Sequence, residues 1–242
     1  MIYKQEINDF LKDLQDYLFP VYYSNRIIKT DDITFTLSKM FNTLKVKNYT
    51  SKEFILDLKE IKEILLLDLE AFYECDPACI NKDEIIITYP GFHSIMMHRI
   101  AHILYLHDVP LLPRMISELS HSSTGIDIHP GANIGHHFFI DHGTGVVIGE
   151  TTVIGNYVRI YQGVTLGALS LQNAHELKNK KRHPTIKDNV IIYANASILG
   201  GNTVIGENVV IGGNVFILSS IEDNKIVVLE NKNYLIKDRK GG

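Results

Sequence analysis

Three short stretches of this sequence carry side chains suited to acid–base chemistry or to binding a charged molecule. They are Asp127-Ile128-His129-Pro130, Asp141-His142-Gly143 and Arg182-His183-Pro184. When a carboxylate accepts a hydrogen bond from one ring nitrogen of a histidine, it fixes the tautomer and leaves the other nitrogen as a base. A guanidinium in a fixed position is suited to binding a carboxylate. Together these residue types suit proton removal from the hydroxyl of a bound molecule that also carries a carboxylate.

The elements that position these stretches follow a period of six residues. Between Ile126 and Ile217 an aliphatic residue returns every six positions, usually beside a small or polar residue. The residues in step are Ile128, Ile134 and Ile140; Ile148, Ile154, Ile160 and Leu166; Ile186, Ile192 and Ile198; and Ile205, Ile211 and Ile217. This period predicts a parallel β-helix in which three short strands close one triangular coil. The alternative, a β-sandwich with Gly-rich turns, expects a period of two and a longer spacing between turns.

Two breaks in this period mark where the chain leaves the coil. Eight residues, not six, separate Ile140 from Ile148, and twenty separate Leu166 from Ile186. The second break predicts a protruding loop over 168–185 that is rich in lysine. Because insertions in a solenoid lie on its outside and often form the binding face, we expect the chemistry at these two breaks.

His142 lies in the first break, and Asp127 precedes it by fifteen residues, close to one coil of about eighteen. Since successive coils stack ~4.8 Å apart, we predict that the Asp127 carboxylate approaches the His142 ring and that His142 acts as a general base. The alternative is a corner histidine that bonds a turn carbonyl. Arg182 and His183 end the second break, and a loop of that length can fold over a neighbouring groove. The lysines at 178–181 fit either a solvated loop or weak attraction of a nucleotide's phosphates.

The remaining histidines suggest little chemistry. Three imidazoles between the subunits of a trimer can hold zinc, and the candidates are His129, His137 and His142. No cysteine or other ligand pattern marks such a site, so no metal is predicted. Three further histidines fall on one predicted helix and are interpreted as packing or hydrogen-bonding residues: His93, His98 and His102.

The first half of the chain has helical periodicity. Apolar spacing predicts helices over 7–18, 33–44, 51–73 and 92–107, the third of them capped by Thr50 or Ser51. Asp76-Pro77-Ala78 breaks the third helix and can open another, with Pro at its first position. A polar turn is expected at 81–84, and residues 114–120 lead into the first coil.

We therefore predict an α+β chain in three parts. They are an N-terminal α-helical domain over 1–120, a β-helix of hexapeptide repeats over 121–221, and a C-terminal strand and tail over 222–242. The helices are expected to cap the solenoid, because a bare coil exposes aliphatic side chains and unpaired strand edges.

Composition argues against several other classes of protein. With 242 residues and a net charge of −4, the chain lacks the basic footprint of a nucleic-acid-binding protein. Its first residues show no signal peptide, and no apolar run reaches the ~18 residues of a membrane span. Cys75 and Cys79 stand alone and are interpreted as reduced thiols. We expect a cytoplasmic protein.

Five stretches closely resemble serine O-acetyltransferase, the bacterial and plant enzyme of cysteine biosynthesis. They are Asp127-Ile128-His129-Pro130-Gly131-Ala132, Ile140-Asp141-His142-Gly143-Thr144-Gly145, Val147-Ile148-Gly149-Glu150-Thr151, Gln162-Gly163-Val164-Thr165-Leu166-Gly167 and Arg182-His183-Pro184. The resemblance continues upstream in Asp76-Pro77-Ala78, Gly91-Phe92-His93 and Arg99-Ile100-Ala101-His102, so that it spans about 69–217.

This resemblance implies a left-handed β-helix that forms trimers, usually doubled to hexamers through the helical domains. It implies transfer of acetyl from acetyl-CoA to the hydroxyl of L-serine, which gives O-acetyl-L-serine in the first step of cysteine biosynthesis. L-Cysteine, the end product, inhibits many members of the family and would compete at the serine site.

The resemblance also implies roles for particular residues. His142 would be the general base, oriented by Asp127. Two carboxylates match positions that bind the amino acid, through its ammonium group: Asp76 and Asp141. The substrate carboxylate would be held by Arg182 and His183. The pantetheine arm of CoA would lie along a wall of small residues: Gly167, Ala168, Ala194 and Gly213.

Three parts of the sequence depart from the family pattern. The segment 168–181 is longer and lacks a Gly/Ser-rich run, and after Ile217 the family's Ala-Gly-Val-Pro-Ala-Arg segment is replaced by 227–231 and a basic tail. The resemblance therefore does not define the CoA contacts there. Members that dock into cysteine synthase use a C-terminal isoleucine, whereas this sequence ends Lys240-Gly241-Gly242, so docking to cysteine synthase is not expected.

Two other functions remain open from the sequence. One is a hexapeptide acetyltransferase that acts on a sugar or xenobiotic hydroxyl. Such an enzyme would keep the His142 base but would not need Asp76, Asp141 and Arg182 around a zwitterion. The other is a trimer that transfers no acyl group, either a zinc hydratase or a structural scaffold.

Overall fold

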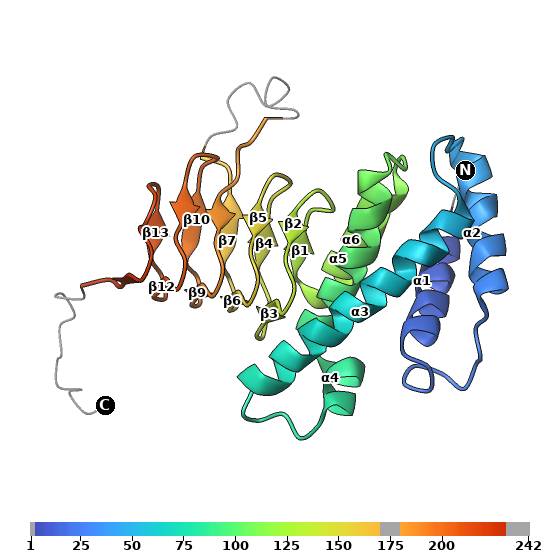
Figure 1. Ribbon diagram of the computed structural model, residues 1–242, viewed down its shortest axis with the longest axis horizontal. Coiled ribbons are helices and arrows are strands. Elements are labelled where there is room, and N and C mark those ends of the chain that lie inside the picture. The colour runs from blue at the N-terminus through green and yellow to red at the C-terminus, as the bar shows by residue number, and fades with distance from the viewer. Residues whose placement is uncertain (1–2, 170–179, 231–242) are drawn as a thin grey trace, which may run out of the picture.

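The computed structural model describes residues 3–169 and 180–230. Over these residues the chain forms a group of helices at one end of a long coil of short strands (Figure 1). The helices are α1 (Lys4–Leu18), α2 (Thr30–Leu44), α3 (Ser51–Cys75), α4 (Lys82–Thr88), α5 (Pro90–Leu106) and α6 (Leu112–Thr124). None of these helices is long and apolar enough to span a membrane.

The longest helix, α3, begins where the sequence predicts it. The Thr50 hydroxyl accepts a hydrogen bond from the Glu53 amide at 3.2 Å, and Glu53 accepts one from the Thr50 amide at 2.7 Å. This reciprocal pair satisfies two amides that no intrahelical bond can reach. The apolar face that follows is buried and includes Phe54, Leu58 and Leu65.

Two expectations for the region after α3 are wrong. Asp76-Pro77-Ala78 does not open a helix, because the Asp76 carboxylate accepts the Ala78 amide at 2.8 Å and closes a turn. The predicted polar turn at 81–84 is instead the start of α4, whose first amides are capped by the Asn81 side chain through the Glu84 amide at 2.9 Å. The segment 114–120, expected to lead into the first coil, lies within the last helix, α6, which runs from Leu112 to Thr124.

The strands stack in parallel into three sheets. The first sheet contains β1 (Asp127–Ile128), β4 (Val147–Ile148), β7 (Thr165–Gly167), β10 (Ser197–Leu199) and β13 (Phe216–Ile217). The second contains β2 (Asn133–Ile134), β5 (Val153–Ile154), β8 (Thr185–Ile186) and β11 (Val204–Ile205). The third contains β3 (Phe139–Ile140), β6 (Arg159–Ile160), β9 (Ile191–Ile192), β12 (Val210–Ile211) and β14 (Ile226–Val227).

This arrangement is a left-handed parallel β-helix, and the six-residue period predicted its register. Ile128, Ile148 and Leu166 are partners in successive strands of the first sheet. Ile134 pairs with Ile154 in the second sheet, and Ile140 with Ile160 in the third. Each of these side chains is at most 8% exposed, so the aliphatic residues form one continuous apolar column inside the coil.

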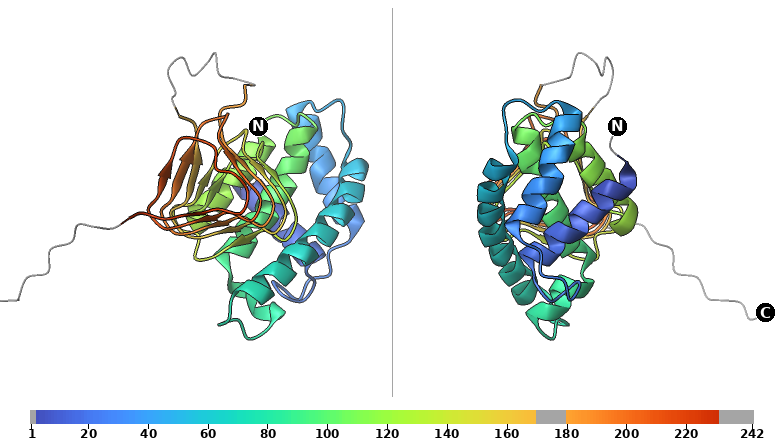
Figure 2. Two further views of the ribbon diagram at one scale, coloured as in Figure 1. Left: turned by 60° about the vertical axis from the view of Figure 1, so that its left-hand side comes forward. Right: turned by 90° about the vertical axis from the view of Figure 1, so that its right-hand side faces the viewer.

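Three edges run along the coil where one sheet turns into the next (Figure 2). We call the turns that follow β3, β6, β9 and β12 the His142 edge, because His142 lies in the first of them. We call the turns that follow β1, β4, β7 and β10 the Arg182 edge, because Arg182 lies between β7 and β8. The first sheet separates these two edges.

A buried ion pair joins the helices to the first coil. Asp68 in α3 accepts two hydrogen bonds from Arg99 in α5, at 2.6 and 2.9 Å, and it also accepts the Phe138 amide at 3.0 Å. Arg99 donates in addition to the carbonyls of Ile134 and Gly135. Both charged side chains are buried, so the pair and its backbone partners satisfy each other where water is excluded. The turn between β2 and β3 is thereby fixed to both helices.

Candidate active site

His142 lies on an exposed turn after β3. Its backbone is left-handed at φ 55°. Gly143 and Gly145 are also left-handed, at 79° and 81°, and these left-handed residues let the turn accommodate the two extra residues of this corner. The His142 side chain is 70% exposed, and its Nδ1 lies 3.7 Å from Oδ1 of Asp141. The corner therefore places an imidazole and a carboxylate beside each other on the outside of the coil.

Asp127 begins β1, one coil below the turn that carries His142. Its amide donates to the Val146 carbonyl at 2.9 Å, and its side chain is half-buried on the outer face of the first sheet. Within the described residues, no hydrogen bond or ion pair joins the Asp127 carboxylate to the His142 ring. The carboxylate in ion-pair range of that ring is Asp141. Orientation of His142 by Asp127 therefore stays a prediction.

Asp76, at the end of α3, belongs to the same region of the molecule. Its Oδ2 accepts a hydrogen bond from the Tyr89 hydroxyl at 2.6 Å. Tyr89 precedes α5, whose first turn packs so closely on β3 that a Cβ at Gly91 would lie 2.2 Å from the Ile140 carbonyl oxygen. Tyr89 thus links the Asp76 carboxylate to the helix whose first turn packs on β3, the strand that precedes Asp141.

Arg182 is held on the other edge by a carboxylate. Its Nη2 donates to Oε2 of Glu150 in a close ion pair, and the Tyr105 hydroxyl from α5 donates to Oε1 of the same Glu150 at 2.9 Å. Burial raises the pKa of Glu150, but the hydrogen bonds from Arg182 and Tyr105 outweigh it and leave that pKa below its ordinary value. Glu150 is therefore an anion that fixes the guanidinium.

His183 is buried beside Arg182, only 8% exposed. Its Nδ1 accepts the Thr151 amide at 3.0 Å, so Nε2 carries the hydrogen of the neutral ring. Burial and the neighbouring Arg182 lower the pKa of His183 to about 4. Gly149 makes room for this ring, since a Cβ there would lie 2.1 Å from its Cδ2. A neutral imidazole that presents Nε2–H beside a guanidinium suits recognition of a carboxylate.

The four residues predicted to line the CoA path are half-buried and divide between the two edges. Gly167 ends β7 and Ala168 follows it, on the Arg182 edge. Ala194 and Gly213 occupy successive turns of the His142 edge, where a Cβ on Gly213 would lie 3.1 Å from the Ala194 carbonyl oxygen. The middle of the predicted loop, 170–179, lies outside the described residues, as does the tail from 231.

The predicted substrate residues therefore fall into two groups on two edges of one coil. Asp141 and His142 lie on the His142 edge, with Asp76 at the end of α3, the helix that packs against β3, and Arg182 and His183 lie on the Arg182 edge. A six-residue side of the coil is roughly 15–20 Å long at the rise of an extended chain. A molecule as small as an amino acid is shorter than this side and does not span both edges of one chain.

The histidines of the zinc alternative lie on three different edges of the first coil. His129 follows β1, His137 follows β2 and His142 follows β3. They cannot meet in one chain, and the described residues contain no group of three possible ligands. The histidines of α5 pack and form hydrogen bonds as expected: His93 contacts Gln15, His98 stacks on His102, and His102 contacts the Pro130 carbonyl.

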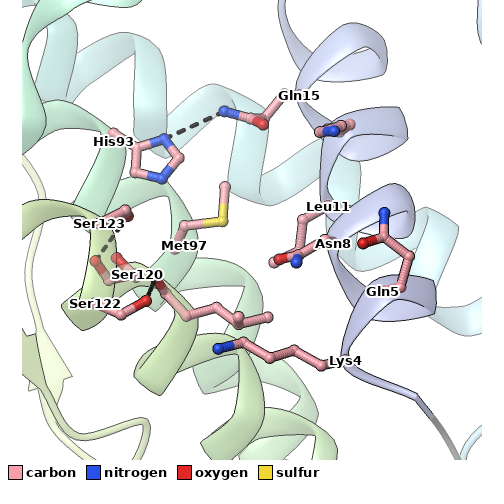
Figure 3. Close-up of a pocket in the computed structure, with 12 residues that line it drawn as sticks. Lys4, Gln5, Asn8, Leu11, Gln15, His93, Met97, Ser120, Ser122 and Ser123 are labelled. Carbon is pink, nitrogen blue, oxygen red and sulfur yellow. Dashed lines mark hydrogen bonds between the residues drawn. The ribbon is translucent and has the colours of Figure 1, made fainter.

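A cavity of about 360 Å³ lies elsewhere, between α1, α5 and α6 (Figure 3). Its polar lining includes Lys4, Gln15, His93 and Ser120, and Gln15 is hydrogen-bonded to His93 at 3.2 Å. None of the predicted site residues lines it. The chemistry of the two edges, and not the size of a cavity, identifies the candidate active site.

The sequence interpretation missed the residues that hold the predicted ones. Tyr89 binds Asp76, Glu150 binds Arg182, and Tyr105 binds Glu150. Glu150 had a signal in the sequence, since it follows Gly149 at a corner one coil below the Arg182 loop. The two tyrosines had none, because their contacts depend on how α5 packs against the coil.

Comparison with known proteins identifies relatives of this chain. Residues 22–96 match the family described as "Serine acetyltransferase, N-terminal". The plasmid serine acetyltransferase of Synechococcus elongatus is 55% identical over 147 residues, which cover 60% of this chain and 46% of that protein. The serine acetyltransferase of Bacillus subtilis is 52% identical over 125 residues, which cover 52% of this chain and 55% of that protein. The alignments thus span about half the length of these curated relatives.

Solved structures extend the comparison to nearly the whole chain. Serine acetyltransferase isoform 3 from Entamoeba histolytica, in complex with cysteine, is 40% identical with a TM-score of 0.79, over 95% of this chain and 84% of that one. The Neisseria gonorrhoeae serine acetyltransferase in complex with serine is 32% identical with a TM-score of 0.69, over 94% and 82%. Identity at this level over both the helices and the coil shows that the chain belongs to the serine acetyltransferase family.

Proposed function

We propose that this protein transfers acetyl from acetyl-CoA to the hydroxyl of L-serine and so forms O-acetyl-L-serine for cysteine synthesis. The observation that carries this proposal is the division of complementary groups between two edges. Carboxylates and an exposed imidazole lie on one edge, and a fixed guanidinium with a neutral imidazole lies on the other. Together they match the ammonium, hydroxyl and carboxylate of a hydroxy amino acid.

His142 is the general base of this reaction. Its free ring nitrogen takes the hydroxyl proton as the serine oxygen attacks the thioester carbonyl carbon. The C–S bond then breaks, and the imidazolium returns the proton to the departing CoA thiolate. Direct transfer needs no acyl-enzyme, and a positioned base contributes ~10²–10⁴-fold to the rate. Asp127 orients the ring across neighbouring coils.

Charged groups on both edges hold the substrate. Asp76 and Asp141 bind the ammonium group, while Arg182 and His183 bind the carboxylate. The neutral His183 donates from Nε2, the nitrogen that does not accept the Thr151 amide. This zwitterion recognition favours serine over a sugar hydroxyl, which offers no charge to either edge.

Acetyl-CoA lies along the same groove. Gly167 and Ala168 on one edge, and Ala194 and Gly213 on the other, leave the backbone open to the pantetheine arm, because none of them carries more than a methyl group. The thioester can then approach the corner that bears His142.

The division between edges supports a homotrimer, which could pair into a dimer of trimers through the helices. In a closed ring of three, each groove receives the His142 edge of one copy and the Arg182 edge of the next. L-Cysteine shares the ammonium and carboxylate of serine, so it would occupy the same pocket as a competitive inhibitor. The cysteine and serine seen in the related structures are consistent with this.

A rate assay tests the proposal. CoA release from acetyl-CoA is measured with L-serine and, in parallel, with a galactoside acceptor. Turnover with L-serine and none with the galactoside is expected. No turnover of L-serine above the background hydrolysis rate would refute the assignment, and turnover of the galactoside alone would favour a sugar acetyltransferase.

A further inference from the structure

The two ends of α5 each carry a tyrosine whose hydroxyl binds a carboxylate of the candidate site. Tyr89 precedes the first turn and donates to Oδ2 of Asp76 at 2.6 Å. Tyr105 lies in the last turn and donates to Oε1 of Glu150 at 2.9 Å. Sixteen residues separate the two tyrosines in the sequence, which corresponds to ~24 Å along a helix.

Tyr105 limits how Glu150 can bind Arg182. A carboxylate can take a guanidinium through both of its oxygens. Here Tyr105 occupies Oε1, so the ion pair with Arg182 uses Oε2 and Nη2. Gly131 permits this arrangement, because a Cβ there would lie 3.0 Å from both Glu150 Cγ and Tyr105 Cζ. Without the hydroxyl, Glu150 could rotate and bind the Arg182 guanidinium through both oxygens. That pairing would compete with a substrate carboxylate for the guanidinium.

Tyr89 fixes Asp76 in a comparable way. The Ala78 amide at 2.8 Å holds Oδ1, and the Tyr89 hydroxyl holds Oδ2. The Tyr89 ring is itself positioned by an edge contact with Phe72, whose ring also packs on Phe139 of β3. The carboxylate is therefore set relative to the strand that leads into Asp141.

The helix between the two tyrosines is fixed to the coil. The buried Asp68–Arg99 pair ties α5 to α3 and to the turn before β3. A rigid helix with a hydroxyl at each end keeps the two carboxylates at a constant separation.

Building on the proposed function, we propose that Tyr89 and Tyr105 are positioning residues for substrate recognition. Tyr89 acts through Asp76 on the ammonium group, and Tyr105 acts through Glu150 and Arg182 on the carboxylate. In a trimer the two ends of one α5 serve two different grooves.

The test compares three acceptors across variants of the full-length protein. L-Serine has both charged groups, L-serinamide lacks the carboxylate, and 3-hydroxypropanoate lacks the ammonium group. For Tyr105→Phe, kcat/KM is expected to fall about tenfold for L-serine and 3-hydroxypropanoate but not for L-serinamide, since a hydrogen bond to a charged group is worth about that much. For Tyr89→Phe, the fall is expected for L-serine and L-serinamide but not for 3-hydroxypropanoate.

Tyr22→Phe is the matched control. It also removes a tyrosine hydroxyl that donates to a carboxylate, Asp83 at 2.7 Å, but this pair lies on neither edge. It should leave the ratios of kcat/KM among the three acceptors unchanged. Equal losses on all three acceptors, or none, for either tyrosine variant would overturn the proposal, since a merely structural role does not distinguish acceptors. If Tyr105→Phe does not fold, Glu150→Gln tests the same contact with Arg182, through the same comparison of kcat/KM among the three acceptors. Wild-type protein that fails to acetylate L-serine would instead refute the proposed function.

Discussion

The His142 edge and the Arg182 edge are built in opposite ways. On the first, the His142 side chain is 70% exposed, and the Asp141 carboxylate lies 3.7 Å away. On the second, His183 is 8% exposed and accepts the Thr151 amide, and Arg182 is paired with Glu150. One edge is open and the other is packed.

The contrast shows which of the two edges is held in a fixed geometry by contacts within the chain. Contacts inside the chain fix the Arg182 edge, and a fixed geometry is what charge recognition requires. The His142 edge leaves its imidazole open to solvent. Covering it with the packed edge of a neighbour would exclude water and strengthen the electrostatic interactions there.

Removing the imidazole of the open edge should have the largest effect. His142→Ala is expected to lower kcat by ~10²–10⁴-fold, because the serine hydroxyl then lacks a base. CoA affinity should change little, since the small residues along the CoA path are untouched. Steady-state kinetics and CoA titration measure both quantities. A kcat within a few-fold of wild type would remove His142 from the role of base.

A second prediction tests whether the edges belong to different copies. His142→Ala and Arg182→Ala proteins are each expected to be nearly inactive. When subunits of the two variants are mixed at random in a trimer, about one groove in four pairs an intact His142 edge with an intact Arg182 edge. Activity should therefore recover to about a quarter of wild type after co-expression or dissociation and reassociation.

The control for this experiment is the double variant mixed with either single variant. No groove in the mixture with Arg182→Ala has an intact Arg182 edge, and none in the mixture with His142→Ala has an intact His142 edge. Both mixtures should stay inactive. If the two single variants also fail to recover activity, the groove lies within one chain and the division of the site is wrong.

Kinetics can distinguish the roles of the two carboxylates near the open edge, Asp127 and Asp141. Asp127→Asn is expected to lower kcat by about 10- to 100-fold, the usual cost of losing an orienting partner. Asp141→Asn should mainly raise KM for L-serine, because it removes a charge that binds the ammonium group. The reverse pattern would make Asp141, which lies 3.7 Å from the ring, the orienting carboxylate instead.

The sequence predicted the coil better than the contacts around it. A period of six specifies strand, register and inward face together, so the eighteen-residue spacing of Ile148 and Leu166 is enough to align them as neighbours in one sheet. The breaks in the period located His142 and Arg182 for the same reason. A repeat makes every departure from it visible.

The rest depended on packing between distant segments. Asp68 and Arg99 are thirty-one residues apart and look like ordinary helix charges, yet together they fix the helices to the coil. Tyr105 and Glu150 are forty-five apart. The sequence does not distinguish the start of α4 from a turn, because its capping residue, Asn81, is typical of both.

The smallest expected effect concerns the packed edge and its pH dependence. Burial lowers the pKa of His183 from 6.5 to about 4, so the folded protein resists a proton that the unfolded chain accepts. Stability is therefore retained above pH 6.5 and decreases as the pH falls towards 4, by up to about 3 kcal/mol from this residue. His183→Gln keeps an acceptor for the Thr151 amide but does not titrate. Urea unfolding at fixed protein concentration, at pH 7 and pH 4.5, should show a smaller pH-dependent loss for the variant than for wild type. Equal losses would show that His183 is protonated without penalty and that the packed edge is open to water.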